Sequence, residues 1–108
     1  MKSIKLSKVE KRILNIIANR GKSVSRLEIT QIANVSSRTV TDAVAKLRSK
    51  GIPIVSERNG KNAGYSIAKD EIDRNKCVAM LTSQATSMMN NINSLANADL
   101  KNWDKRII

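Results

Sequence analysis

The residues with the clearest potential for recognition chemistry lie between positions 37 and 46. If this stretch is helical, the apolar residues Val40, Val44 and Leu47 share one face, because residues three and four apart lie on the same side of a helix. Short polar side chains and Arg or Lys on the opposite face suit a DNA major groove, where they can meet base edges. The outward-facing residues are Ser37, Arg38, Thr41, Asp42, Ala45 and Lys46.

Each polar residue of this face has a different expected role. Arg38 is the best candidate for bidentate contact with a guanine, and Ser37 and Thr41 would make weaker contacts with bases or phosphates. Asp42 would either accept a hydrogen bond from a cytosine amino group or pair with Arg38 and orient it. Lys46 would attract the DNA backbone without regard to sequence.

This helix is the second half of a predicted helix-turn-helix over residues 25–49. Ser25 with Glu28 three residues later is a capping-box pattern, which predicts a helix start. The break between the helices falls at residues 34–37, where a serine can cap the second helix. In the first helix we expect four apolar residues to face the core, namely Leu27, Ile29, Ile32 and Ala33.

A further helix precedes this pair and a hairpin follows it. Ser7 with Glu10 predicts a helix start, and Gly21 predicts its end. Residues 52–57 and 65–68 are rich in β-branched and aromatic side chains and flank a glycine-containing turn, so they predict a β-hairpin. Its tip is placed to contact phosphates or the minor groove through Arg58, Asn59, Lys61 and Asn62.

The positive charge of the chain is concentrated in the same region. The 108 residues carry a net charge of +11, with 20 Lys and Arg against 9 Asp and Glu. Residues 1–69 hold 15 basic and 4 acidic side chains, whereas residues 70–108 hold 5 of each. A basic surface restricted to the helix-turn-helix region favours a polyanionic partner.

The composition excludes several classes of function. The chain has no His and one Cys, so a Cys/His zinc site, a His-activated nucleophile and an intrachain disulfide cannot form. We therefore expect no catalytic residue, metal or cofactor. With one Trp, one Tyr and no Phe, stacking platforms for single strands are missing, which favours duplex DNA. The N-terminus lacks a signal-peptide core, and we expect a cytoplasmic protein.

The run VSSRTVTDAVAKLRSKGIPIVSERNG, followed by GYSI, resembles the type-11 helix-turn-helix domain found in biotin operon repressors and WYL-type transcriptional regulators. The resemblance covers about residues 7–68. It implies a winged-helix fold and duplex DNA binding through the second helix of the motif and the wing. The last forty residues are too short for a biotin ligase or a WYL domain, so ligand sensing is not implied.

Residues 70–108 have a different pattern, which predicts a long helix. Asp70, Glu71 and Asp73 crowd a helix start, where carboxylates favour the positive end of the helix dipole. Apolar residues then recur with spacings of 3, 4, 3, 4 and 3, which is a heptad seam. We call these residues the seam: Val78, Leu81, Ala85, Met88, Ile92 and Leu95. Residues 77–98 carry no charge but many amides and hydroxyls, which argues against a membrane span.

The sequence thus predicts a mainly α protein with a small β-hairpin. Residues 1–69 would form a winged-helix DNA-binding domain, and residues 70–108 a helical segment that dimerises through the seam. The alternative is that the seam folds back on residues 8–18. The predicted function is a dimeric, sequence-specific regulator of transcription, most simply a repressor. Two alternatives are a replication or partition accessory protein and an adapter that binds proteins. Trp103 is expected to anchor a short terminal helix capped by Asp99, or to serve a partner site if it is exposed.

Overall fold

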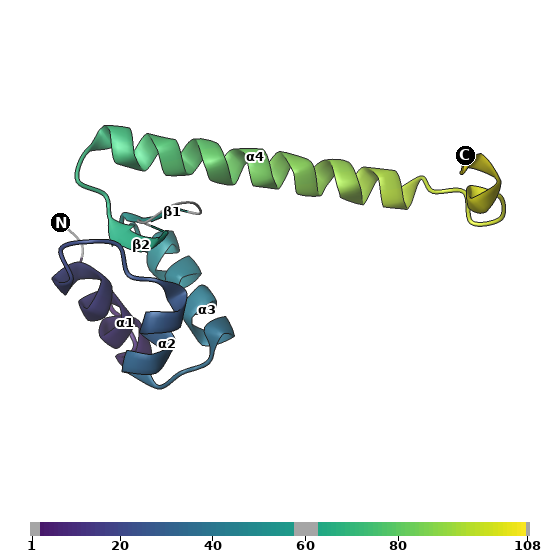
Figure 1. The fold of residues 1–108 in the computed structure, drawn as a ribbon. Coiled ribbons are helices and arrows are strands. Elements are labelled where there is room, and N and C mark those ends of the chain that lie inside the picture. The colour runs from purple at the N-terminus through teal and green to yellow at the C-terminus, as the bar shows by residue number, and fades with distance from the viewer. Residues whose placement is uncertain (1–2, 58–62, 108) are drawn as a thin grey trace. The chain divides into compact units, whose positions relative to one another are not determined.

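The computed structural model of the chain describes residues 3–57 and 63–107. It has the predicted fold class, a mainly α chain with one small hairpin and a long C-terminal helix (Figure 1). The chain divides into two compact units: the first unit is Met1–Cys77 and the second unit is Val78–Ile108. The elements in order are α1 (Lys8–Asn19), α2 (Arg26–Ala33), α3 (Ser37–Ser49), β1 (Ile54–Glu57), β2 (Gly64–Ile67), α4 (Glu71–Ala96) and the 3₁₀ helix η1 (Trp103–Arg106).

The start and end of α1 follow the predicted signals. Ser7 Oγ accepts a hydrogen bond from the Glu10 amide, and Glu10 Oε1 accepts one from the Ser7 amide, both at 3.1 Å. These two bonds satisfy amides that lack partners within the helix. Gly21 follows the helix with φ of +71°, a left-handed conformation that glycine adopts at little cost.

Three polar residues set the start of α2 and the turn between α2 and α3. Ser25 Oγ accepts from the Glu28 amide at 3.1 Å and caps α2. Asn34 ends α2 in the left-handed region at φ of +54°, and its amide donates to the Thr30 carbonyl. Ser36 Oγ then accepts from the Thr39 amide at 3.1 Å and starts α3. The predicted break at residues 34–37 is confirmed.

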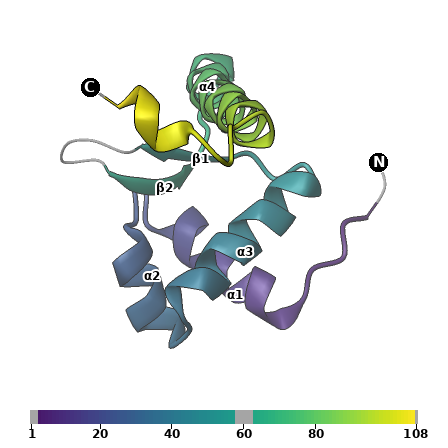
Figure 2. The same cartoon turned by 90° about the vertical axis from the view of Figure 1, so that its right-hand side faces the viewer.

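The core of the first unit lies where α1, α2 and α3 meet one another and the hairpin. Figure 2 shows the three helices gathered on one side of β1 and β2, as does Figure 1. Apolar residues of the buried cluster come from each of these helices, from the link before α2 and from β1. They are Ile13, Ile17, Val24, Ile29, Val40, Ala43, Val44, Leu47 and Ile54.

One part of the predicted core is wrong. Leu27 is 67% exposed and Ile32 is 53% exposed, although both were expected to face inward. In an 8-residue helix the buried face is narrow, and Ile29 and Ala33, four residues apart, occupy it. Leu27 lies nearly opposite that face and Ile32 lies at its edge, so both side chains are exposed.

The hairpin is antiparallel, with Ile54 opposite Ile67 and Glu57 opposite Gly64. A bridge joins it to the link before α2, because Val24 and Tyr65 exchange backbone hydrogen bonds of 2.8 Å in both directions. Gly64 has φ of +138°, and a Cβ there would collide with the Val24 carbonyl. The glycine of the GYSI strand is therefore required by a close approach of two backbones.

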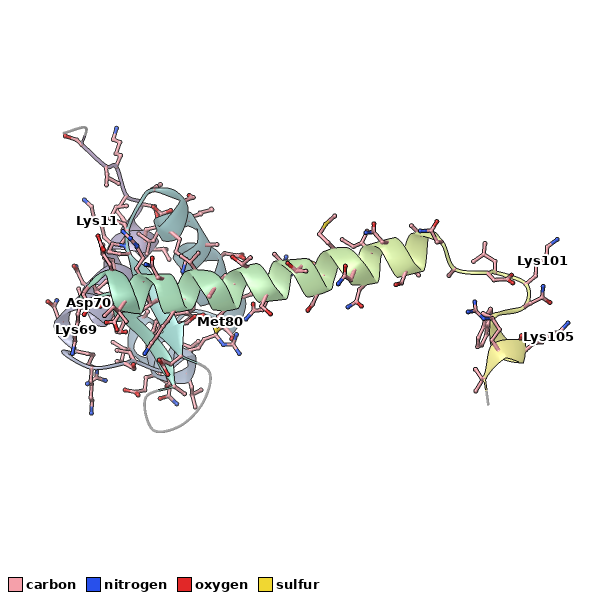
Figure 3. The ribbon with its side chains drawn as sticks, turned by 90° about the horizontal axis from the view of Figure 1, so that it is seen from above. Lys11, Lys69, Asp70, Met80, Lys101 and Lys105 are labelled. Atoms are coloured by element: carbon pink, nitrogen blue, oxygen red, sulfur yellow. The ribbon has the colours of Figure 1, made fainter. Side chains whose placement is uncertain are left out.

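Helix α4 begins at the predicted cluster of carboxylates. Asp70 Oδ1 accepts from the Asp73 amide at 2.9 Å, and Asp73 Oδ2 accepts from the Lys69 amide at 3.1 Å. The helix then runs unbroken for 26 residues. Figure 3 shows Lys69 and Asp70 together at the start of this helix, and Lys101 and Lys105 beyond its end. In the part of the chain that the structure describes, no helix is both long and apolar enough to cross a membrane.

Candidate nucleic-acid interface

The outer face of α3 carries all five polar residues expected to read DNA. Val40, Ala43, Val44 and Leu47 are buried on the inner face and hold the helix against the core. This packing leaves the opposite face open to a ligand. The exposed polar side chains on that face are Ser37, Arg38, Thr41, Asp42 and Lys46.

Arg38 and Asp42 lie one helical turn apart and form a loose ion pair. Arg38 Nε is 3.9 Å from Asp42 Oδ2, and the side chains are 91% and 62% exposed. An exposed pair of this kind adds little stability. It restricts the orientation of the guanidinium, and its Nη atoms remain available to a base edge.

Thr41 also makes a local bond. Its hydroxyl donates to the Ser37 carbonyl at 3.2 Å, a common arrangement for threonine in a helix. Because the hydroxyl proton is engaged, Thr41 presents an oxygen acceptor and a methyl group outward. Such a surface suits an amino group of a base or the methyl group of thymine.

A contact that sequence reasoning missed ties α3 to the hairpin and to the start of α4. Arg48 Nε donates to the Ile54 carbonyl at 2.8 Å, and Arg48 Nη2 lies 3.3 Å from Ser56 Oγ and 3.8 Å from Cys77 Sγ. Arg48 lies in the last turn of α3, where a cation also suits the helix dipole. This position in the last turn is the only local sequence signal for a structural role of Arg48, because the residues that Arg48 contacts lie 6 to 29 positions away in the sequence.

A second missed contact joins α3 to α1. Lys50 Nζ donates to Glu10 Oε1 at 2.6 Å and to the Lys5 carbonyl at 3.0 Å. Glu10 is almost fully buried. Its carboxylate accepts the hydrogen bond from Lys50 and also caps the start of α1. The hydrogen bond from Lys50, helped by that from the Ser7 amide, lowers the pKa of Glu10 below its usual range.

The wing is the hairpin formed by β1 and β2. The structure describes both strands, but the four residues of the tip that are predicted to contact DNA lie outside the described residues. Their expected role stays a prediction from the sequence. These residues are Arg58, Asn59, Lys61 and Asn62.

The seam faces outward along α4. Val78, Met88, Ile92 and Leu95 are more than half exposed, Ala85 is exposed, and Leu81 is partly buried.

Trp103 is 60% exposed, so it does not anchor η1. Asp99 Oδ1 accepts from the Lys101 and Asn102 amides, which caps the turn before η1. Cys77 is buried with a free thiol. Within residues 3–57 and 63–107, no group of His, Cys, Asp and Glu could hold a metal.

The comparison with protein families agrees with the predicted helix-turn-helix. The family described as HTH domain (HTH_11) matches residues 9–66. No curated protein matches the chain. A solved structure of a zinc-responsive MarR family member, Lactococcus lactis ZitR, is similar at 19% identity with a TM-score of 0.48. That similarity covers 84% of this chain and 63% of the other, so the chain spans less than two thirds of that protein.

Proposed function

Since the chain belongs to the HTH domain family over residues 9–66, we propose that it is a homodimeric regulator of transcription that binds specific duplex DNA. The observation that carries the proposal is the outer face of α3. It presents Arg38, Thr41 and Lys46 on a helix whose opposite face is fully packed. A rigid helix of this kind can place several side chains in a major groove at once.

In this proposal two kinds of interaction contribute to the free energy of DNA binding. The first is attraction between the basic surface and the phosphates, to which Lys46 adds, and it weakens steeply with salt. The second is base reading, in which Arg38 contacts a guanine and Asp42 keeps the guanidinium in place or meets a cytosine. Wing residues Arg58 and Lys61 add further phosphate contacts in this scheme.

The proposed regulatory outcome is repression. A dimer bound at a promoter would block transcription simply by occupying the site. Two copies joined through the seam would insert two α3 helices into successive major grooves about one helical turn apart. In this proposal the chain acts in the cytoplasm by binding DNA and does not catalyse a reaction.

Selection from a pool of random duplexes tests this function. The full chain is incubated with the pool at about 50 mM and about 200 mM salt, and the bound DNA is sequenced. We expect an enriched palindrome with half-sites about 10 bp apart. Binding without enrichment would contradict sequence-specific regulation and favour an accessory role in replication or partition. No binding at either salt would favour a protein adapter.

A further inference from the structure

We propose that α4 pairs with α4 of a second copy in antiparallel orientation, so that Val78 faces the partner's Leu95, Leu81 faces the partner's Ile92, and Ala85 faces the partner's Met88. The inference rests on the proposed homodimer and specifies its geometry. It follows from the residues of the seam, which α4 presents to solvent.

Packing volume gives the first argument. A parallel pair places each seam residue opposite its own copy, so Ala85 meets Ala85 and leaves a void, while Met88 meets Met88. The antiparallel register places the small Ala85 against the long Met88 twice. The two central layers then combine a small and a long side chain, as close packing favours.

The register is unique. Shifting one helix by a heptad in either direction leaves seam residues of both helices without an apolar partner. Only the stated register matches all six seam positions on each helix. The two-fold axis then passes midway between the levels of Ala85 and Met88.

Charge gives an independent argument. Continuing the seam spacing before Val78 reaches Arg74 and Glu71, in the first turn of α4. In an antiparallel pair these two residues lie at opposite ends of the paired helices, far from their own copies. In a parallel pair Arg74 faces Arg74 and Glu71 faces Glu71, and these like charges repel.

A second copy is also the occupant that the composition of α4 favours. The residues from Cys77 to Ala98 carry no charge, so the flanks of the seam offer nothing to a charged partner. Their amides and hydroxyls match an identical helix equally well in either direction. The seam and its ends therefore decide the orientation.

The antiparallel geometry also sets the distance between the two copies of Cys77. Each Cys77 would lie level with the partner's Ala96. The two Cys77 residues would then be roughly 30 Å apart along the helix axis, at a rise of about 1.5 Å per residue.

Disulfide cross-linking between two versions of the full chain tests the orientation. In a Cys77→Ser background, one version carries Leu81→Cys and the other, with a tag, carries Ile92→Cys. After mixing and mild oxidation, we expect the mixed dimer to cross-link at least tenfold more than either version alone. A matched control with Ser83→Cys and Asn90→Cys, on the outward side of α4, should cross-link only weakly. Cross-linking of each version with itself would overturn the antiparallel arrangement.

Spin-label distances test it with the seam unchanged. Single labels at Lys76→Cys and Ser83→Cys, again with Cys77→Ser, lie on the outward side of α4. An antiparallel pair makes the distance between the two position-76 labels longer than that between the position-83 labels by roughly 15 Å. Equal distances would overturn the inference while leaving the dimer and its DNA binding in place. A monomer in sedimentation would overturn the inference and the dimer together, whereas the duplex selection judges DNA recognition separately.

Discussion

The two units of this chain use their apolar residues in opposite ways. The first unit has a shared cluster of buried apolar side chains, in which Leu47 and Ile29 are fully inaccessible. In the second unit the apolar residues of α4 are exposed at regular intervals, and Leu95 is 78% exposed. The charges divide in the same way, because all of the net positive charge belongs to residues 1–69.

This contrast teaches that one unit contains its own core whereas the other presents half of a core. Burial of apolar surface is the main favourable term in folding, so a regular exposed stripe indicates a missing partner. A basic first unit and a helix α4 that carries no charge from Cys77 onward suit the proposal that DNA contact and self-association are separate. The following predictions test that separation.

The largest effect should come from Leu47. Leu47→Ala removes a fully buried side chain of the first unit and should lower its free energy of unfolding by about 2 to 5 kcal/mol. Urea denaturation followed by circular dichroism measures this loss. The matched variant Leu95→Ala makes the same chemical change on the exposed seam, and it should leave the unfolding of the first unit unchanged while raising the dimer dissociation constant. Equal destabilisation by both variants would contradict the contrast between the units.

Arg38 should affect recognition without affecting either core. Arg38→Ala should reduce discrimination between the selected site and random DNA by about 1 to 3 kcal/mol, because a bidentate base contact is lost. Fluorescence anisotropy with both duplexes measures the change. Lys46→Ala is the control, expected to weaken binding to both duplexes alike. An equal loss on both duplexes for Arg38→Ala would remove Arg38 from base reading.

The pair of Glu10 and Lys50 should give the first unit a distinct sensitivity to acid. The pKa of Glu10 is lower in the folded chain than in the unfolded chain, so the stabilisation is complete above the ordinary glutamate range. It should be lost as the pH falls through the lowered pKa, when the carboxylate accepts a proton. Unfolding midpoints measured across this acid range should fall less steeply for Glu10→Gln. Identical slopes for the two proteins would show that the pair does not contribute.

The smallest effect is expected on the outer side of α2. Leu27→Ser changes an exposed side chain, and its effect on the unfolding free energy should stay within about 0.5 kcal/mol. Ile29→Ser, two residues along the same helix, should be strongly destabilising by comparison because Ile29 is fully buried. A large loss of stability for Leu27→Ser would mean that a contact covers Leu27 in solution.

Much of the fold could be predicted because its signals are local. The capping pairs at Ser7 and Ser25, the left-handed Asn34 and the glycine after α1 each fix one helix boundary within a few residues of sequence. The exposed seam was also foreseen, because a heptad spacing on a long helix is a property of that helix alone. The family match over residues 9–66 bears out the resemblance drawn from the same stretch.

The remaining features depend on contacts between distant segments. The exposure of Leu27 and Ile32 depends on which face of α2 the rest of the unit covers, and the spacing of apolar residues in so short a helix does not fix that face. The bonds from Arg48 to Ile54 and Cys77, and from Lys50 to Glu10, join residues that no local pattern connects. The DNA-reading roles of Arg38 and Asp42 stay predictions, supported by their exposed position on α3.

The absence of charge from residues 77–98 also has a consequence for proteolysis. Trypsin cuts after Lys and Arg, and the chain offers it no site between Lys76 and Lys101. Complete digestion should therefore release residues 77–101, including the entire seam, as a single peptide. A cross-linked dimer would yield two such peptides joined together, whose mass can be read without interference from the DNA-binding unit.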